Sequence, residues 1–259
     1  MTSRALVTGA SAGIGRAFAQ QLAARGTDLV LVARDGARLE ELATELRSRA
    51  GVAVECRAAD LLDPAGLEAV ASRVAADDQP VDLLVNNAGM GTFGHFATLD
   101  GERELDEVRL NVVALVRLTH AALGAMEARG SGAVVNVSSI AGYQPAPDSA
   151  TYGATKAFVN SFSHALHEEA RAKGVHVMAL CPGYTRTEFH ERAGLGVSHL
   201  PEMLWQSADE VVRVALRDLD RHRSVSIPGA INKTIVSVSS VSPPNVSRRV
   251  ARLVIRRTG

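Results

Sequence analysis

The amino-acid sequence predicts an α/β fold: a single domain built on a doubly wound parallel sheet with helices on both faces. Short apolar runs, rich in β-branched residues, alternate with longer segments in which apolar residues recur at helical spacing. No internal repeat or low-complexity linker interrupts this alternation over 259 residues, and 46% hydrophobic with 22% charged residues suits one large core. Such alternation implies right-handed crossovers between parallel strands.

The expected strands are apolar throughout, as strands are when helices cover both faces of a sheet. They are Ala5–Val7, Leu29–Val32, Val52–Cys56, Val81–Val85, Ala133–Val137 and Val175–Leu180. The helices expected between them are Ile14–Arg25, Ala37–Arg49, Leu67–Ala76, Arg103–Arg129 and Tyr152–Lys173. Asp35 and Asp63 stand where N-cap residues belong, and Pro64 follows at a first helical position.

Charge and cysteine content exclude several classes of protein. Lys+Arg 28 balance Asp+Glu 28, so the net charge does not favour nucleic acid. Cys56 and Cys181 fit no metal or redox spacing and are expected to be buried thiols in a reducing cytosol. The N-terminus enters a strand at once, without room for a signal peptide, and no uninterrupted apolar run approaches the ~20 residues of a membrane span. We therefore expect a cytoplasmic protein.

A glycine-rich turn between the first strand and the first helix is a candidate phosphate site. Thr8–Gly15 has the spacing G-x-x-x-G-x-G rather than the G-x-G-x-x-G dinucleotide fingerprint. Glycines allow close backbone approach, and the amides and dipole of the following helix attract a pyrophosphate, although tight packing alone would also favour glycine. Dinucleotide binding implies a Rossmann-type sheet with its ligand at the carboxyl ends of the strands. The residues expected to face the cofactor are Gly9, Ser11, Gly13, Ile14 and Gly15.

The end of the second strand favours NADP(H) over NAD(H). An acidic residue there would bind the ribose hydroxyls of NAD, whereas arginine suits the 2′-phosphate of NADP. Ala33 occupies the acidic position and Arg34 follows it, with Ser11 and Arg38 as candidate helpers. Asp60, after the third strand, is either an adenine contact or a plain loop aspartate.

Tyr152 and Lys156 form the candidate proton-transfer pair. Four residues apart on a helix, they share one face, with Ser138 and Ser139 upstream at the end of an apolar run. A free phenol ionises near pH 10, and a neighbouring cation lowers that pKa toward the range of efficient acid-base catalysis. A serine hydroxyl nearby could hold a substrate oxygen. An ordinary helix start with a surface lysine would look the same locally.

The motifs together resemble the short-chain dehydrogenase/reductase family, and the resemblance covers residues 4 to about 190. They occur in one order and spacing: Thr8–Gly15, Asn86–Gly89, Asn111 within a helix, Ser139 thirteen residues before Tyr152, Lys156, and Pro182-Gly183.

The resemblance implies catalytic roles for four of these residues. Tyr152 would be the general acid-base, and Ser139, selected over Ser138 by the family spacing, would orient the substrate oxygen. Lys156 would hold the nicotinamide ribose and depress the tyrosine pKa. Asn111 would position a water linking Lys156 to solvent, although an Asn inside a helix can also simply kink it or face solvent.

The resemblance also adds cofactor contacts. These are Asn87, Ala88 and Gly89 after the fourth strand, and Pro182, Gly183 and Thr187 after the sixth. Thr187 matches the family threonine that contacts the nicotinamide carboxamide, with Thr185 as a nearby competitor. Ala12 departs from the pattern, because many NADP-using relatives carry a basic residue there. Arg34 is left with most of the phosphate recognition.

The activity so implied is that of an NADP-dependent carbonyl reductase or alcohol dehydrogenase acting on a hydrophobic or mid-sized carbonyl or secondary alcohol. An epimerase or dehydratase on the same fold would need an extra acid or base pair, which is not evident. A noncatalytic NAD(P)-sensing protein would be favoured by loss of Tyr152 or Lys156, and both are present.

The remaining features concern metals, a lid and partners. His164 and His167 share a helix face, but no metal motif appears, so an interface or surface role is favoured.

Residues of about 187–206 mix large apolar side chains with glycines, as a mobile lid or a packed excursion would. The extension of about 228–259 ends in a basic amphipathic segment, expected to pack on the protein or another subunit rather than on a membrane. A homodimer or homotetramer through the two longest helices follows from the resemblance.

Overall fold

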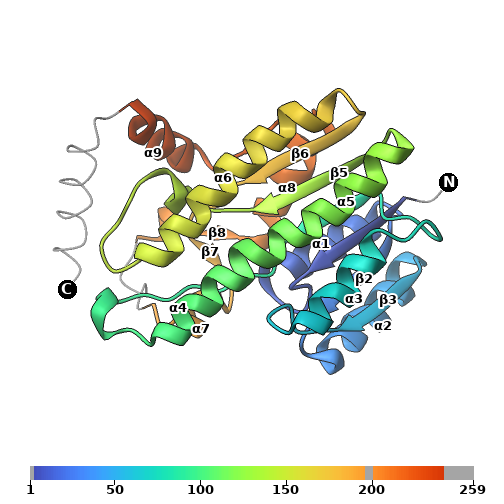
Figure 1. Ribbon diagram of the computed structural model, residues 1–259, viewed down its shortest axis with the longest axis horizontal. Helices are drawn as coiled ribbons and strands as arrows, with labels where there is room; N and C mark the ends of the chain where they lie inside the picture. Colours follow the sequence, from blue (N-terminus) through green and yellow to red (C-terminus); the bar gives the residue numbers. More distant parts are fainter. Residues whose placement is uncertain (1–2, 196–200, 242–259) are drawn as a thin grey trace.

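A seven-stranded sheet forms the centre of the molecule in the computed structural model, which describes residues 3–195 and 201–241, Ser240 and Val241 by backbone only. All neighbouring strands are parallel, in the order β3-β2-β1-β4-β5-β6-β9 (Figure 1). The six predicted strands are present, and a short strand at Val225–Ser226 is the seventh. They are β1 (Arg4–Thr8), β2 (Asp28–Ala33), β3 (Val54–Ala58), β4 (Leu83–Asn86), β5 (Gly132–Val137), β6 (Val175–Leu180) and β9 (Val225–Ser226).

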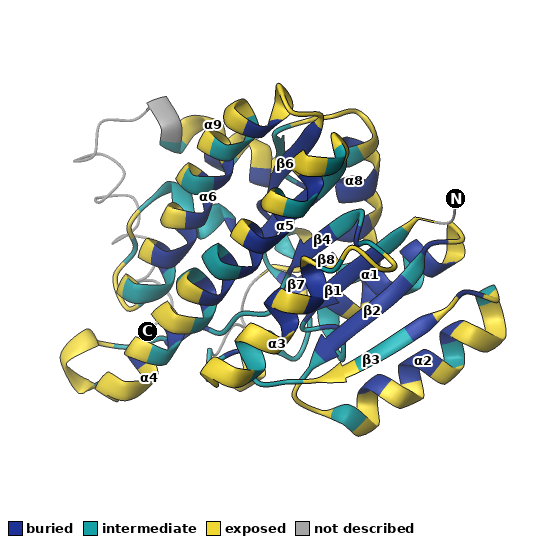
Figure 2. Ribbon diagram, turned by 45° about the vertical axis from the view of Figure 1, so that its right-hand side comes forward, coloured by how far each residue is buried: buried dark blue, intermediate teal, exposed yellow. Residues whose placement is uncertain are grey.

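Helices cover both faces of this sheet, as predicted. One core cluster joins the sheet to α1 (Gly13–Ala24), α2 (Gly36–Ala50) and α8 (Ala208–Asp220). The other joins it to α3 (Pro64–Val74), α5 (Leu115–Arg129) and α6 (Ala150–Arg171). Figure 2 shows the inner strands mostly dark blue, the edge strand β3 mostly teal and yellow, and the outward faces of these helices yellow, which is the burial expected of amphipathic helices on a two-sided sheet.

The predicted helix Arg103–Arg129 is continuous but not uniform. It consists of α4 (Gly101–Val108), a π-helical segment η2 (Arg109–Ala114) and α5. By length and composition alone, Gly101–Arg129 passes as a membrane span among the described residues, yet its buried face packs on the sheet with Leu118, Ala122 and Met126. The π-helical turn carries Asn111, and such turns occur frequently at functional sites.

The predicted caps are confirmed. Asp35 accepts a hydrogen bond from the Arg38 amide (3.1 Å), and Asp63 accepts one from the Gly66 amide (2.9 Å). One burial expectation was wrong in part: Cys181 is buried, but Cys56 on β3 is only partly buried because that strand forms the edge of the sheet.

Short elements between β6 and β9 were not predicted. They are β7 (Thr185–Arg186) and β8 (Gln206–Ser207), which pair with each other, α7 (Phe189–Arg192) and the 3-10 turn η4 (Glu202–Leu204). Two further 3-10 turns, η1 (Phe96–Thr98) and η3 (Ile140–Tyr143), and the helix α9 (Ala230–Val241) complete the described elements. The predicted basic helix at 246–254 lies outside the described residues.

Candidate active site

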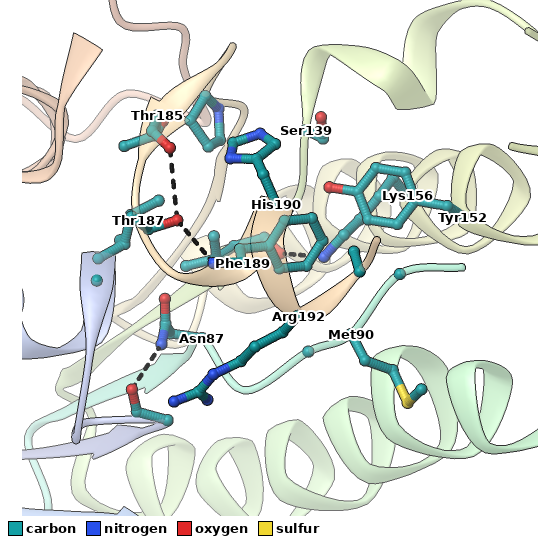
Figure 3. Close-up of a pocket in the computed structure, with 18 of the residues that line it drawn as sticks. Asn87, Met90, Ser139, Tyr152, Lys156, Thr185, Thr187, Phe189, His190 and Arg192 are labelled. Atoms are coloured by element: carbon teal, nitrogen blue, oxygen red, sulfur yellow. Dashed lines mark hydrogen bonds between the residues drawn. The ribbon is translucent and has the colours of Figure 1, made fainter. Parts of the chain in front are cut away.

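A pocket of about 1470 Å³ opens at the carboxyl edge of the sheet. It spans the ends of β1 and β4, between which the strand order reverses, and continues past β5 and β6. In open α/β sheets this switch point is where ligands bind. Figure 3 shows side chains from α6, the β4 turn and the segment after β6 gathered around it.

The glycine-rich turn forms one wall. Gly9 and Gly13 have φ of +65° and +53°, a region that favours glycine, and a Cβ at Gly9 would lie 2.8 Å from Asn87 Nδ2. At Gly13, a Cβ would lie 2.9 Å from Thr187 Cγ2. No side chain caps the start of α1, in contrast to the Asp caps of α2 and α3, and no acidic residue occupies its first turn. A dinucleotide pyrophosphate therefore fits this helix start.

Gly15 has a different role from the one predicted. It does not line the pocket, whereas the other predicted residues of this turn do: Gly9, Ser11, Gly13 and Ile14. A Cβ at Gly15 would lie 2.3 Å from the Gly9 carbonyl oxygen. Glycine is required here for the close packing of the turn on its own helix.

Thr8 and Asn87 join the ends of β1 and β4. The Thr8 hydroxyl accepts hydrogen bonds from the Asn87 and Ala88 amides (2.9 and 3.0 Å). The Asn87 side chain donates to the carbonyl oxygens of Thr8 and Gly9 (2.9 and 3.3 Å). The side chain of Asn87 thus holds the glycine-rich turn, while Ala88 and Gly89 line the pocket beside it.

The corner beyond β2 is basic but already contains an ion pair. Arg34, Arg38 and Ser11 line it, as expected of a 2′-phosphate site. Arg38 Nη1 donates to both carboxylate oxygens of Glu188 (3.2 and 3.1 Å), and Arg192 also pairs with Glu188.

Asp60 lines the pocket, and its Oδ1 accepts a hydrogen bond from the Leu62 amide at 3.0 Å. This contact suits the loop-aspartate reading, and the adenine contact stays a prediction.

Tyr152, Lys156 and Ser139 meet on the opposite wall. Figure 3 shows the phenol oxygen of Tyr152 directed into the pocket on the side of Ser139, with Lys156 behind the ring. Lys156 Nζ lies 5.7 Å from the centroid of that ring and donates to the Val137 carbonyl oxygen at 3.0 Å. Ser138 is occupied differently, because its hydroxyl donates to the Lys156 carbonyl oxygen (2.9 Å). The Ser139 oxygen accepts a hydrogen bond from the Ala141 amide (3.1 Å), and its side chain lines the pocket beside Tyr152, so Ser139 is the serine placed to meet a substrate.

The expected depression of the tyrosine pKa is not found. Burial raises the pKa of Tyr152 to about 12, opposed by its hydrogen bond with Ser139, and the Lys156 ammonium is not among the causes. Burial also lowers the pKa of Lys156 to about 8, opposed by the negative charge of Glu107. Desolvation thus outweighs the pairwise attraction that the i, i+4 spacing suggested. At neutral pH the phenol is protonated, which suits a proton donor.

Asn111 is buried and binds the main chain of the loop after β4. Its Oδ1 accepts from the Met90 amide (2.9 Å), and its Nδ2 donates to the Met90 carbonyl oxygen (2.8 Å) and to Thr155 Oγ1 (3.2 Å). A Cβ at Gly89 would lie 3.0 Å from Asn111 Oδ1 and 3.7 Å from Lys156 Nζ. Asn111 does not line the pocket, and the water that it would position stays a prediction.

The segment after β6 crosses the pocket opposite Tyr152. Pro182, Gly183, Thr185 and Thr187 all line it. The Thr185 hydroxyl donates to the Gly183 carbonyl oxygen (3.0 Å). The Thr187 hydroxyl accepts from the Phe189 amide (3.3 Å) and donates to the Thr185 carbonyl oxygen (3.4 Å), while the Thr187 methyl group faces Gly13. Its position beside the glycine-rich turn favours Thr187 as the cofactor contact.

Aromatic rings from the loop after β4 and from the predicted lid segment shape the substrate half of the pocket. Phe93 and Phe189 flank the Tyr152 ring, at centroid distances of 5.4 and 5.7 Å. His190 contacts the rings of Tyr184 and Trp205 (5.9 and 5.2 Å), and burial lowers the pKa of His190. The described part of the predicted lid is thus held by ring packing, and its mobility stays a prediction. The apolar composition of 187–206 was the available signal.

No group of three or more potential metal ligands occurs within the described residues. His167 instead packs edge-on against His176, at a centroid distance of 5.2 Å.

Comparison with known proteins gives a consistent result. The model of the short chain dehydrogenase family matches residues 3–196. A sulfoacetaldehyde reductase of Chromohalobacter salexigens is 41% identical over 194 residues, covering 73% of this chain and 75% of that protein. A short-chain dehydrogenase from Sphingobium yanoikuyae in complex with NADPH superposes with a TM-score of 0.84 at 41% identity, covering 93% of this chain and 96% of that one. A bulky-bulky ketone specific alcohol dehydrogenase from Comamonas testosteroni has a TM-score of 0.80 at 35% identity, covering 93% and 95%.

Proposed function

The chain belongs to the short-chain dehydrogenase/reductase family and is an NAD(P)-dependent oxidoreductase, and from this premise we propose that it reduces bulky, largely apolar ketones to secondary alcohols with NADPH. The observation that carries the proposal is the Tyr152 phenol directed into a large pocket beside Ser139. When bound, the reduced nicotinamide supplies the hydride for the carbonyl carbon.

The residues of this chain supply orientation and the proton. Ser139 donates a hydrogen bond to the substrate carbonyl oxygen and holds it near the Tyr152 phenol. Tyr152, protonated at neutral pH, gives its proton to that oxygen as the alcohol forms. Lys156, fixed by the Val137 carbonyl oxygen, keeps a positive charge beside the ring and would hold the ribose of a bound cofactor.

The preference for NADPH is supported by the basic corner. Arg34 and Arg38 lie on the pocket wall where the second strand ends, and Asp35 is engaged as a helix cap. The Sphingobium yanoikuyae structure contains NADPH. NAD(H) remains the alternative cofactor.

Substrate bulk is supported by the size and lining of the pocket. Beyond Tyr152 its walls are aromatic and aliphatic, contributed by Phe93, Phe189, Leu195, Leu204 and Ile235. Polar side chains such as Gln144 and Ser239 also line it, but they bond to each other and apolar surface predominates, so the pocket selects mainly by shape and apolar area. The Comamonas testosteroni enzyme is described by its specificity for ketones with two bulky substituents.

Assembly and location complete the proposal. Val113 and Phe158, on the long helices, are 52% and 40% exposed, and Phe158 stacks on Phe162 with a centroid distance of 5.5 Å. Exposed apolar side chains on these helices support a homodimer or homotetramer. Both cysteines are free, as in a reducing compartment, which supports a cytoplasmic location.

The direct experiment is a panel of ketones of increasing bulk, with NADPH oxidation followed by absorbance. Diaryl or aryl-alkyl ketones should give higher kcat/KM than acetone-sized ketones by at least tenfold. Equal rates across the panel, or turnover restricted to small charged aldehydes, would contradict the substrate proposal.

A further inference from the structure

Glu107 has a buried carboxyl group to which the proposed reaction assigns no role. It lies in the last turn of α4 and has no exposed surface (0%). Its Oε2 accepts two hydrogen bonds from Thr92, one from the amide (2.8 Å) and one from the hydroxyl (2.6 Å). Among the described residues no donor reaches its Oε1. A buried carboxyl oxygen without a partner costs more free energy when the group is ionised than when it is protonated and neutral.

The contact with Thr92 fixes a wall of the pocket. Glu107 and Asn111 lie one turn apart and hold the same loop, Glu107 at Thr92 and Asn111 at Met90. Between these anchors, a Cβ at Gly91 would lie 3.1 Å from Tyr152 Cδ2. Phe93, the next residue after Thr92, packs on the Tyr152 ring at 5.4 Å. Figure 3 shows the chain at Met90 passing below Tyr152 in that view.

The same carboxyl acts electrostatically on the pair. Burial is the largest influence on both pKa values, and Glu107 is the carboxylate that raises the pKa of Tyr152 and of Lys156. A negative charge at Glu107 therefore keeps both groups protonated to higher pH, the state that proton donation requires.

The groups that face Glu107 explain why it can change charge near neutral pH. Burial raises the pKa of Glu107 to about 7. The negative charge of Glu104, on the same helix, raises this pKa further, whereas the Thr92 hydrogen bonds and the positive charge of Lys156 on α6 lower it. Glu104 is itself buried and bonded to the Thr151 hydroxyl, with its Oε1 unpartnered among the described residues. The arginine of the next turn, Arg109, pairs with Asp106 instead.

We propose that Glu107 is a positioning residue, which holds the loop at Thr92 against Tyr152 and, through the charge of its titratable carboxyl, sets the upper pH limit of ketone reduction. The inference rests on the proposed function, since it concerns the protonated state of Tyr152 as donor. Its chemistry is reversible loss of one proton from the carboxyl to solvent, and no covalent step is involved.

The test compares Glu107→Gln with Glu104→Gln in the full-length protein. Gln at position 107 keeps a carbonyl oxygen for Thr92 and removes the charge. Glu104 is the matched control, because it is also a buried carboxyl but does not contribute to the pKa shift of Tyr152 or of Lys156. In kcat/KM profiles for NADPH-dependent ketone reduction, Glu107→Gln should move the alkaline limb down by at least 0.5 pH unit, with less than a threefold loss of kcat below pH 6. Glu104→Gln should leave the limb in place. An unmoved limb in Glu107→Gln, or an equal movement in both variants, would overturn the proposal.

A second measurement needs no turnover. The unfolded carboxyl ionises near pH 4.5 and the folded one near 7, so wild-type Tm should fall, relative to Glu107→Gln, as pH rises through this window. Thr92→Val removes a hydrogen bond that lowers the pKa of Glu107, so the fall in Tm should occur at higher pH in this variant than in the wild type. The same variant provides the comparison if Glu107→Gln fails to fold. Parallel Tm curves in all three proteins would overturn the proposal. Absence of turnover with every ketone would instead contradict the proposed function, while the Tm curves would still decide whether Glu107 titrates.

Discussion

Arg38 and Glu188, which are 150 residues apart in the sequence, form a bidentate ion pair across the cofactor end of the pocket, with Nη1 3.2 and 3.1 Å from the two carboxylate oxygens. Arg38 stands in the first turn of α2 and Glu188 immediately precedes α7. The hydrogen bond from Arg38, the largest cause, lowers the pKa of Glu188, and Arg192 adds to it. The Glu188 carboxylate is thus already paired with Arg38, one of the arginines that would bind a 2′-phosphate.

Removing that carboxylate should therefore favour NADPH. In Glu188→Gln, Arg38 is released for the 2′-phosphate, so the Kd for NADPH should fall severalfold while the Kd for NADH changes less than twofold. Fluorescence titration of both cofactors measures this. Equal weakening of both cofactors would show that the pair serves only to hold the lid segment closed.

The cofactor preference itself should depend on Arg34. A charge-assisted hydrogen bond contributes roughly 1.5–3 kcal/mol, so Arg34→Ala should raise the KM for NADPH by about 10- to 100-fold and leave the KM for NADH nearly unchanged. Arg49→Ala, in the last turn of α2, is the matched control, since Arg49 pairs with Glu45 away from the pocket. A similar loss for both cofactors would refute phosphate recognition by Arg34.

His176 should make the fold sensitive to acid. It is 8% exposed on β6, its ring lies between His167 and His222 (5.2 and 5.3 Å), and burial lowers its pKa to about 4. Below pH 6.5 the unfolded chain binds a proton that the folded chain does not, so stability should fall as pH drops from 6.5 to 4, by up to ~3 kcal/mol. Denaturant unfolding of wild type and His176→Gln at pH 7 and 4.5 measures the difference. An equal loss in both proteins would contradict it.

Local patterns were sufficient to predict the sheet and to select side chains that the fold brings together. The all-apolar runs marked the strands because helices cover both faces, and Gly9 and Gly13 were marked by the turn after β1. The spacing of Ser139, Tyr152 and Lys156 identified three side chains that the fold brings to one wall of the pocket. These features depend on short segments, where residue type and conformation are closely linked.

Features that depend on tertiary contact could not be predicted in this way. The anchor of Glu107 at Thr92 joins a helix to a loop, and nothing in the sequence near Glu107 distinguishes it from the surface acid Asp106. The pKa of Tyr152 was misjudged because the helical spacing to Lys156 is visible in the sequence, whereas the burial that dominates the pKa is not.

The measurement that tests the account most directly is single-turnover ketone reduction by Tyr152→Phe, with NADPH binding followed in the same samples. Phe keeps the ring between Phe93 and Phe189 and removes only the hydroxyl group, the proposed source of the proton. The Kd for NADPH should therefore stay within twofold while the rate falls by about 10²- to 10⁴-fold. Tyr143→Phe, whose hydroxyl lies 3.8 Å from Cys181 Sγ, is the control and should retain its rate. Near-normal turnover in Tyr152→Phe would show that the proton comes from another group.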